Sequence, residues 1–188
     1  VHNPITPVGM DFVGIEVAQD FNIALNDMGE VYTWGQNGSG ELAVPTSTPS
    51  LNCPFKTGIC DAVKVDAGYQ YSVVLLYDST VTTFGVNQRG QLGNGNNTTT
   101  HIPQTVSSLT QVTDISTGYP HTLAIRKDGT VWSWGENRYG ELGNHLLTSF
   151  QGGGAFASNV PVKVTFANGT TLNKIKQEDP FAVNLLND

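Results

Sequence analysis

His121 is the side chain in this sequence that most resembles a catalytic group, because it stands directly before the hydroxyl group of Thr122. A histidine beside a hydroxyl group is the pairing that nucleophilic catalysis uses. The residues 50 and 100 positions earlier in the chain are Tyr71 and Phe21. A position that holds His, Tyr and Phe at one regular spacing is a packing position, so we predict that His121 has a structural role.

The other ionisable residues form no recognisable catalytic or metal-binding pattern. His2, His101 and His145 lie in irregular segments without the spacing of metal ligands. Asp27 and Asp128 stand at tight turns, where hairpin geometry explains an aspartate. The sequence also lacks a Gly-x-Ser-x-Gly nucleophile elbow and a phosphate-binding loop. We therefore expect neither an enzyme nor a bound metal or cofactor.

The two cysteines, Cys53 and Cys60, are close together in the sequence. Pro54 and Gly58 between them favour a compact turn, so the pair is a candidate disulfide, and two free thiols are the alternative. A disulfide would favour an extracellular or other oxidising location over a cytoplasmic or nuclear one. A metal site at this pair would need further ligands, and no neighbouring His or Cys supplies them.

Asn-x-Ser/Thr sequons would agree with secretion, although they are about as frequent here as chance allows. The candidate glycosylation sites are Asn37, Asn96, Asn97 and Asn168. They therefore add little to the expectation of an extracellular location.

The composition is that of a globular protein with little charge. The chain has 188 residues, of which 38% are hydrophobic and 13% are charged. These shares exclude disorder and a collagen-like structure for the chain as a whole. The longest apolar run, residues 73–76, is far shorter than the roughly 20 residues that span a bilayer. A formal net charge of −7 argues against a broad basic surface. We expect neither nucleic-acid binding nor membrane insertion in this segment.

An internal repeat of 50 residues defines the elements that position these side chains. Residues 31–37 (VYTWGQN) recur as residues 81–87 (VTTFGVN) and as residues 131–137 (VWSWGEN). A Gly-x-Leu segment follows each copy at the same interval. An aromatic residue, a glycine and an asparagine recur in each copy and are predicted to be structural: Trp34, Gly35 and Asn37; Phe84, Gly85 and Asn87; Trp134, Gly135 and Asn137.

Each unit consists of short predicted strands joined by tight turns. In the first unit, residues 15–17, 22–25 and 31–34 have strand-like patterns, and an Asn-Asp-Met-Gly turn precedes the last of them. The second unit has Tyr77-Asp-Ser-Thr80 at this turn and lacks the Gly, so we predict a different turn type there. No segment shows sustained helical periodicity, and the predicted fold class is all-β. A period near 50 with an aromatic–Gly pair in each unit is typical of a β-propeller.

The repeated pattern resembles the regulator of chromosome condensation repeat family. It reads Gly-x-x-His-[Ser/Thr], followed by Asp-Gly-x-Val-x-x-Trp-Gly-x-Asn-x-x-Gly-x-Leu-Gly, and residues 118–143 match it best. The second unit departs from it at Tyr71 and Phe84, and the first has Ala18 for the leading Gly. WD-type and kelch signatures are absent. The resemblance covers roughly residues 8–188 and implies blades of four antiparallel strands in a propeller of seven blades.

Seven blades of this period need about 350 residues, so we predict that the chain is part of one propeller. It would hold three repeats and part of a fourth, placed at approximately 12–62, 63–111, 112–171 and an incomplete 172–188. Two longer segments, 44–61 and 145–159, are interpreted as insertions. We expect the remainder of a larger polypeptide, or further subunits, to close the propeller.

Residues that vary between units at one fixed position are the binding candidates. Between the repeated Asn and Gly of the units lie Ser39, Gln88, Arg89, Arg138 and Tyr139. These loop tips are predicted to line one face, where Arg and Tyr favour interfaces; plain solvated loops are the alternative. The leading hypothesis is a non-enzymatic module that binds or scaffolds another protein through these tips and the insertions. The family resemblance implies two alternatives, a guanine-nucleotide exchange factor for a small GTPase and a secreted enzyme inhibitor.

Overall fold

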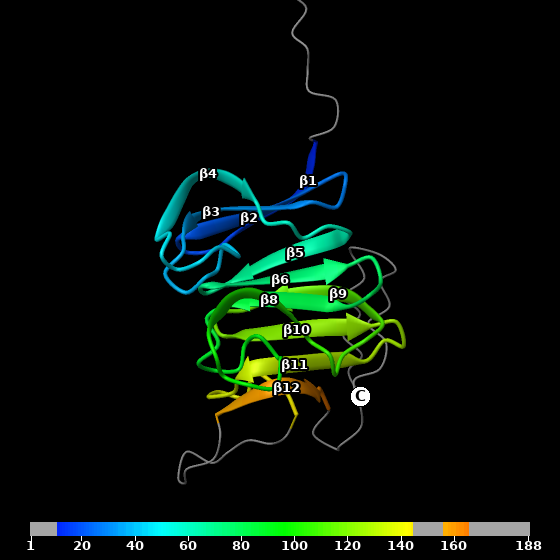
Figure 1. Cartoon of the computed structure of the whole chain (residues 1–188). Helices are drawn as coiled ribbons and strands as arrows, with labels where there is room; N and C mark the ends of the chain where they lie inside the picture. Colours follow the sequence, from blue (N-terminus) through cyan, green and yellow to red (C-terminus); the bar gives the residue numbers. More distant parts are fainter. Residues whose placement is uncertain (1–10, 145–155, 166–188) are drawn as a thin grey trace, which may run out of the picture.

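The computed structural model describes residues 11–144 and 156–165, and its regular structure is entirely strand. The strands form three antiparallel sheets of four, which stack face to face in chain order (Figure 1). Each sheet takes its strands in sequence order, so each is one blade of a partial β-propeller. The first blade contains β1 (Phe12–Val17), β2 (Phe21–Asn26), β3 (Val31–Gln36) and β4 (Ser50–Lys56); the second contains β5 (Ala62–Gly68), β6 (Tyr71–Leu76), β7 (Val81–Gly85) and β8 (Thr100–Thr105); the third contains β9 (Val112–Thr117), β10 (His121–Arg126), β11 (Val131–Glu136) and β12 (Ala157–Lys163).

The strand register repeats with the sequence. Leu25 lies opposite Val31 in the first blade, and the residues 50 and 100 positions further along pair in the same way. The ladder between the third and fourth strands is irregular at the repeated glycine of each blade. In the third blade this residue is Gly135, whose φ is 101°, and a Cβ there would lie 2.3 Å from the carbonyl oxygen of Pro120. The glycine is therefore required by both its conformation and its neighbours.

The turn between the second and third strands is the same in all three blades, so our prediction of a different turn in the second blade is wrong. Ser79 adopts a φ of 66°, close to the 76° of Gly29 and the 79° of Gly129. The N–H of each of these residues donates to the carbonyl of the last residue of the preceding strand. Asp78 accepts hydrogen bonds from the N–H and the hydroxyl group of Thr80. These bonds hold Ser79 in a conformation that usually favours glycine.

The structure does not contain the candidate disulfide and agrees with the alternative of two free thiols, because Cys53 and Cys60 are both free and exposed. Residues 44–61 include the strand β4 where we expected a compact turn. Cys53 lies in the middle of β4, which advances about 3.3 Å per residue and so carries the chain away from it. The carbonyl of Ile59 accepts the N–H of Val31, which places the end of this segment beside the start of β3. The expectation of an oxidising compartment thus loses the bond on which it depended.

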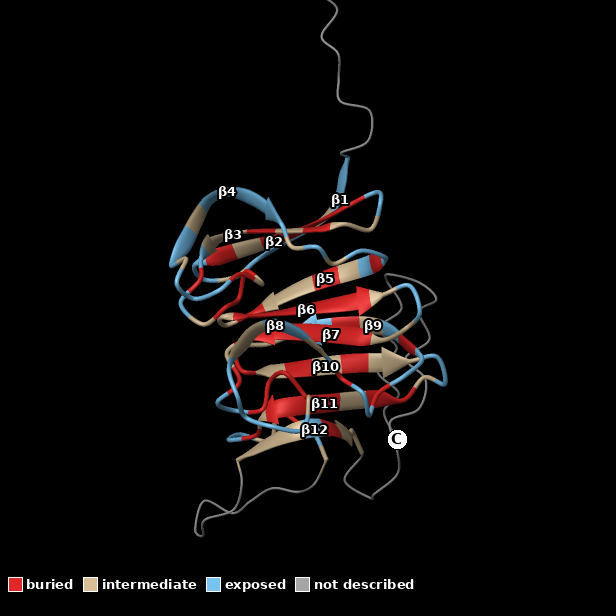
Figure 2. Cartoon of the chain, in the orientation of Figure 1, coloured by how far each residue is buried: buried red, intermediate tan, exposed pale blue. Residues whose placement is uncertain are grey.

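The hydrophobic core lies between the blades. Figure 2 shows the buried residues concentrated in inner strands such as β2, β6, β7 and β11, whereas β1 and β4 are mostly exposed. One cluster joins the first and second blades and includes Ile23, Val65 and Phe84. Another joins the second and third blades and includes Leu75 and Trp134. Because neighbouring blades share each cluster, the packing of one blade fixes the position of the next.

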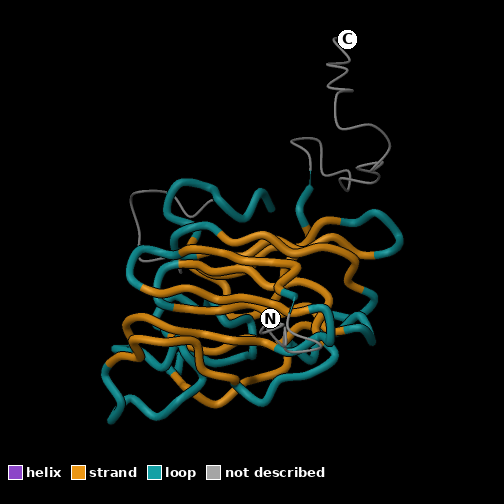
Figure 3. The backbone as a smooth tube through the Cα atoms, turned by 90° about the horizontal axis from the view of Figure 1, so that it is seen from above, coloured by secondary structure: helices purple, strands orange, loops and turns teal. Residues whose placement is uncertain are grey.

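The loops gather at the two ends of the strands, which run through the middle of the stack when it is seen from above (Figure 3). Some of the predicted features lie outside the described residues. They are residues 172–188, which we interpret as the start of a fourth unit, residues 145–155 of the second predicted insertion, and Asn168. The described remainder of that insertion, residues 156–159, includes the first residues of β12.

Candidate functional site

The turns after the first strands and the loops after the third strands lie at the same end of each blade. This arrangement follows from the antiparallel order of each sheet, in which the first and third strands run in one direction. We call this end the loop-tip face. It carries Ser39, Gln88, Arg89, Arg138 and Tyr139 on the loops, and Tyr69 and Tyr119 on the turns.

The repeated asparagines hold the loops behind these tips. The side-chain NH2 of Asn37 donates to three loop carbonyls at 2.8–3.1 Å, and its Oδ1 accepts the N–H of Leu42. Asn87 and Asn137 accept the equivalent N–H in their own loops. All three asparagines are buried. The tips are therefore presented on loops with fixed backbones, as a preformed binding surface requires.

Hydrogen bonds also tie each loop to the next blade. The hydroxyl group of Ser72 donates to the carbonyl of Glu41 at 2.9 Å. In the following pair of blades, Thr122 donates to the carbonyl of Gln91 at 3.4 Å, and the indole Nε1 of Trp134 donates to the same carbonyl at 2.9 Å. These bonds are buried and join residues of different blades. They fix the tips of neighbouring blades relative to one another.

A groove of about 310 Å³ lies between the tips of the second and third blades. Gln88 and Arg89 reach it from the loop of the second blade, and Arg138 reaches it from the loop of the third. Tyr69 and Tyr119 line it from the turns. Three of the five predicted tip residues thus meet in one place, which is our candidate functional site.

Two arginines of this groove share one carboxylate. The Nε atoms of Arg89 and Arg138 lie 3.5 and 3.8 Å from the Oε1 atom of Glu136. The Glu136 side chain is only 16% exposed, whereas both guanidinium groups are about half exposed. Neither guanidinium group donates a hydrogen bond to another described residue. The groove therefore carries a net positive charge with free donors, although the whole chain is acidic.

Two tyrosines form the inner wall of the groove. The rings of Tyr69 and Tyr119 stack with centroids 4.2 Å apart, and the N–H of Tyr69 donates to the carbonyl of Tyr119. A side-chain hydrogen bond with Tyr69 raises the pKa of Tyr119, so this phenol is neutral at physiological pH. Val86 and Pro120 add apolar surface beside the rings. The groove thus combines a charged rim with an apolar wall.

The two other tip residues lie apart from this groove. Ser39 belongs to the first blade, and its hydroxyl group lies 3.3 Å from the side-chain oxygen of Gln70 in the second. Tyr139 is 77% exposed at the tip of the third blade. Sequence reasoning did not identify Tyr69, Tyr119 or Glu136. The sequence did contain a signal for the two tyrosines. They stand 50 positions apart, two residues before Tyr71 and His121, and at the same end of the blade as the tips.

His121 packs against glycine in the position that Tyr71 occupies in the second blade. A Cβ at Gly118 would lie 2.3 Å from the imidazole ring, and a Cβ at Gly68 would meet the ring of Tyr71 in the same way. The hydroxyl group of Tyr71 donates to the carbonyl of His121 at 2.7 Å. The Nδ1 atom of His121 is buried and has no hydrogen-bond partner among the described residues. This environment is that of a packed side chain.

Asn37 is a poor glycosylation acceptor, because it is completely buried and its nitrogen is engaged by loop carbonyls. Asn96 and Asn97 are exposed. Within residues 11–144 and 156–165, no group of three or more His, Cys, Asp or Glu side chains is placed to hold a metal ion. The same residues include no helix that could cross a membrane.

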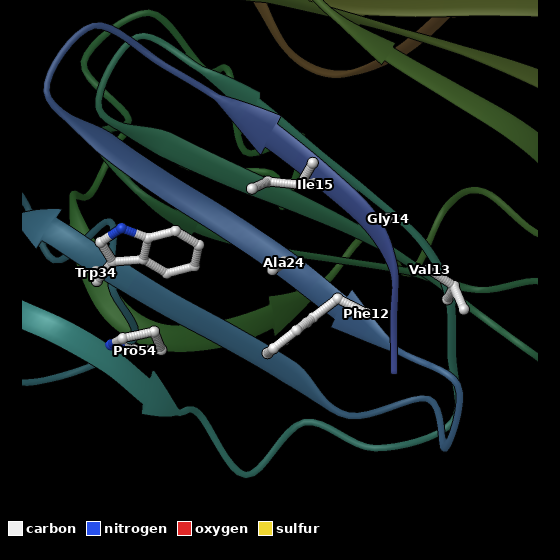
Figure 4. Close-up of a pocket in the computed structure, with 7 residues that line it drawn as sticks. All are labelled: Phe12, Val13, Gly14, Ile15, Ala24, Trp34 and Pro54. Carbon is white, nitrogen blue, oxygen red and sulfur yellow. The ribbon is translucent and has the colours of Figure 1, made fainter. Parts of the chain in front are cut away.

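A second unpartnered surface is the outer face of the first blade. A groove of about 320 Å³ lies there. Figure 4 shows Phe12, Ile15 and Trp34 among its lining residues. Ile15 is 60% exposed, whereas Val65 and Ile115, at the same repeat position, are at most 3% exposed beneath the preceding blade. No described residue takes the place of a preceding blade at Ile15. We call this surface the open flank.

Comparison with protein-family models matches the chain to the Regulator of chromosome condensation (RCC1) repeat at residues 28–75, 78–125 and 128–177. A second model of the same repeat matches residues 112–141. Each of the three longer matches begins at the turn before the third strand of a blade, and the first two extend into the next blade. The sequence repeat is thus out of phase with the structural blade. Comparison with curated proteins found no match.

Solved propellers share the fold. Prp20p from Saccharomyces cerevisiae is 22% identical over 82% of this chain and 39% of its own, with a TM-score of 0.69. Human WBSCR16 is 22% identical over 85% of this chain and 40% of its own, with a TM-score of 0.70. The chain spans about two fifths of the length of these proteins.

Proposed function

The chain belongs to the regulator of chromosome condensation (RCC1) repeat family, and on that basis we propose that it is a non-enzymatic module that binds another protein through its loop-tip face. The groove between the second and third blades carries this proposal. Arg89 and Arg138 stand half exposed at its rim, on loops whose backbones are fixed by buried asparagines. Charged donors held on a rigid scaffold and next to aromatic rings are the chemistry of a protein interface.

We place the module within a longer propeller. The open flank supports this part of the proposal, because Ile15 and Trp34 occupy repeat positions that a neighbouring blade buries elsewhere in the chain. A preceding blade of the same polypeptide, or of another subunit, would cover them.

The identity of the protein partner is a separate question. Prp20p from Saccharomyces cerevisiae binds Gsp1p and histones, and a second structure shows Prp20 bound by Kap60. At 22% identity the likeness is one of fold. We therefore propose a protein partner at the loop-tip face, and nucleotide exchange on a small GTPase is an outcome that the test distinguishes.

The test is affinity capture from an extract of the source cells, with quantitative mass spectrometry of the bound proteins. The test variant carries Arg89→Ala, Arg138→Ala and Tyr139→Ala. The control variant carries Tyr77→Ala and Lys127→Ala, which lie exposed at the opposite ends of the strands. We expect at least one protein that the wild type and the control retain and that the test variant loses.

If the wild type, the test variant and the control variant all retained the same bound proteins, a binding site at the loop-tip face would be contradicted. Loss of a bound protein by the control variant alone would place the binding site at the opposite ends of the strands. An exchange assay with small GTPases loaded with fluorescent GDP runs in parallel. Accelerated release of GDP would replace the proposed non-enzymatic role with that of an exchange factor.

A further inference from the structure

We propose that the groove between the second and third blades binds an extended acidic peptide segment, with an Asp or Glu carboxylate between Arg89 and Arg138 and a neighbouring proline or other apolar side chain against Tyr69 and Tyr119. The inference rests on the proposed function, because it names the chemistry of the partner at the same face. The groove, the shared carboxylate and the stacked rings carry it together.

The charges leave a place for one more carboxylate. Both arginines approach the same oxygen of Glu136 through their Nε atoms, so the terminal nitrogens of both remain available as donors. A second carboxylate between them would accept from both guanidinium groups and make the cluster of four charges neutral. Charge-assisted bonds of this type are the strong ones at interfaces.

The propeller framework does not require these charges. The positions 50 residues before Arg89 and Glu136 hold Ser39 and Val86, and the seam between the first two blades is closed without an ion pair at these positions. The backbone N–H of Ser39 and that of Arg89 make the same loop bond, to the side chains of Glu41 and Gln91. The loop therefore keeps its shape with or without an arginine at its tip.

The apolar wall selects an extended segment. The rings of Tyr69 and Tyr119 stack on each other, and Pro120 and Val86 line the same groove. Grooves walled by aromatic rings accept proline-containing extended segments, whose backbone is already ordered before binding. A segment lying along this wall would carry an adjacent carboxylate to the arginines.

A carboxylate fits this site better than a phosphate group. Glu136 already neutralises one of the two arginines, so the site has one net positive charge to offer. A carboxylate carries one negative charge, whereas a phosphoserine carries close to two at neutral pH. The second charge would face the carboxylate of Glu136 without a partner.

The test measures the binding of three fluorescent decapeptides by anisotropy. The first alternates Glu and Pro, the second alternates Gln and Pro, and the third alternates phosphoserine and Pro. We expect saturable binding of the Glu peptide, at least tenfold weaker binding of the Gln peptide, and no gain from phosphate. Arg89→Gln and Arg138→Gln should each weaken binding of the Glu peptide at least tenfold, and Lys127→Gln should leave it unchanged.

Glu136→Gln provides the most discriminating result. It removes the competing carboxylate, so it should tighten binding of the Glu peptide several-fold, and a misfolded variant could not produce that gain. Equal binding of the Glu and Gln peptides, tighter binding of the phosphoserine peptide, or weaker binding by Glu136→Gln would overturn the inference. Capture of a protein that depends on the tip residues, combined with no binding of the Glu peptide, would leave the proposed function standing and reject this acidic ligand.

Discussion

At the scale of single residues, Glu41 is the side chain whose environment fits its chemistry least well. It is completely buried, its Oε2 accepts the N–H of Ser39, and its Oε1 has no hydrogen-bond partner among the described residues. Burial raises the pKa of this carboxyl group, against the opposing effect of backbone hydrogen bonds. The second blade has an uncharged amide, Gln91, at the same position. The repeat therefore does not require a carboxyl group at this buried position.

We predict that Glu41→Gln raises the free energy of unfolding at pH 7 by about 1–2 kcal/mol, a typical cost of a buried group without a partner. Because the pKa of Glu41 is higher in the folded than in the unfolded protein, the penalty is absent below the unfolded pKa, grows as the pH rises from the unfolded to the folded pKa, and is complete above the folded pKa. The gain from Glu41→Gln should therefore shrink as the pH falls from 7 towards 4. Urea denaturation of both proteins across this range measures it.

The matched control for this prediction is Gln91→Glu in the second blade. It introduces the same carboxyl group at the equivalent buried position, so it should lower the free energy of unfolding at pH 7 and lose its effect at acidic pH. A difference between Glu41→Gln and the wild type that stays constant with pH would show that the carboxylate charge is not the cause.

At the scale of elements, the contact between each loop and the next blade depends on two residues that change together. In the third blade, Trp134 lies over Gly93, and a Cβ at Gly93 would approach the indole Nε1 to 2.7 Å. At the preceding seam the aromatic residue is Phe84 of the second blade. Ala43, in the loop of the first blade, takes the place of the glycine there. The smaller ring leaves room for the alanine, while the indole requires a glycine and gains a hydrogen bond to the preceding loop.

This arrangement predicts a coupling between Phe84→Trp and Ala43→Gly. Phe84→Trp alone should destabilise the protein, because the indole meets the Cβ of Ala43. In the double variant the indole can donate to the carbonyl of Glu41, as Trp134 donates to that of Gln91. We expect a coupling energy of at least about 1 kcal/mol in a double-mutant cycle of unfolding free energies. Additive effects would contradict this account of the seam.

Most of the fold could be predicted from the sequence, because the 50-residue phase fixes which residues share a position in each blade. The loss of glycine at Ser79 misled the prediction of its turn, since hydrogen bonds around the turn hold a serine in the glycine conformation. The expectation of a compact turn between Cys53 and Cys60 also failed, because a strand through Pro54 cannot be distinguished from a turn by composition alone.

The site was predictable only in part. The variable tips Arg89 and Arg138 stand out against the repeated framework, but their meeting point depends on the seam between two blades. Glu136 and the stacked pair of Tyr69 and Tyr119 are brought there by packing across that seam. A repeat aligned along the chain shows which residues are equivalent, and it does not show which residues of neighbouring units touch.

At the scale of the whole molecule, the open flank is an exposed copy of the blade face that is buried at each seam between blades. Phe12, Ile15 and Trp34 line an exposed groove at one end of the stack. Their counterparts in the third blade include Ile115 and Trp134, which are buried against the second blade. An exposed apolar sheet face favours association with another sheet. The chain by itself should therefore self-associate through this flank.

The paired substitutions Ile15→Lys and Ile115→Lys test this expectation, because they introduce one side chain at one repeat position in two environments. Ile15→Lys should abolish self-association in sedimentation equilibrium and change the free energy of unfolding by less than about 0.5 kcal/mol, as for other surface sites. Ile115→Lys should lower the free energy of unfolding by about 3 kcal/mol or more, because an unpaired charge enters the core.

The same pair distinguishes the isolated chain from a closed propeller. In a longer polypeptide whose preceding blade covers the flank, Ile15→Lys should become as destabilising as Ile115→Lys, because the two positions then have the same surroundings. A monomeric chain in which Ile15→Lys already costs as much as Ile115→Lys would show that residues outside the described ranges cover the flank. The cost of one lysine at position 15 therefore reports whether a neighbour occupies the flank, and the comparison with position 115 sets the scale for that cost.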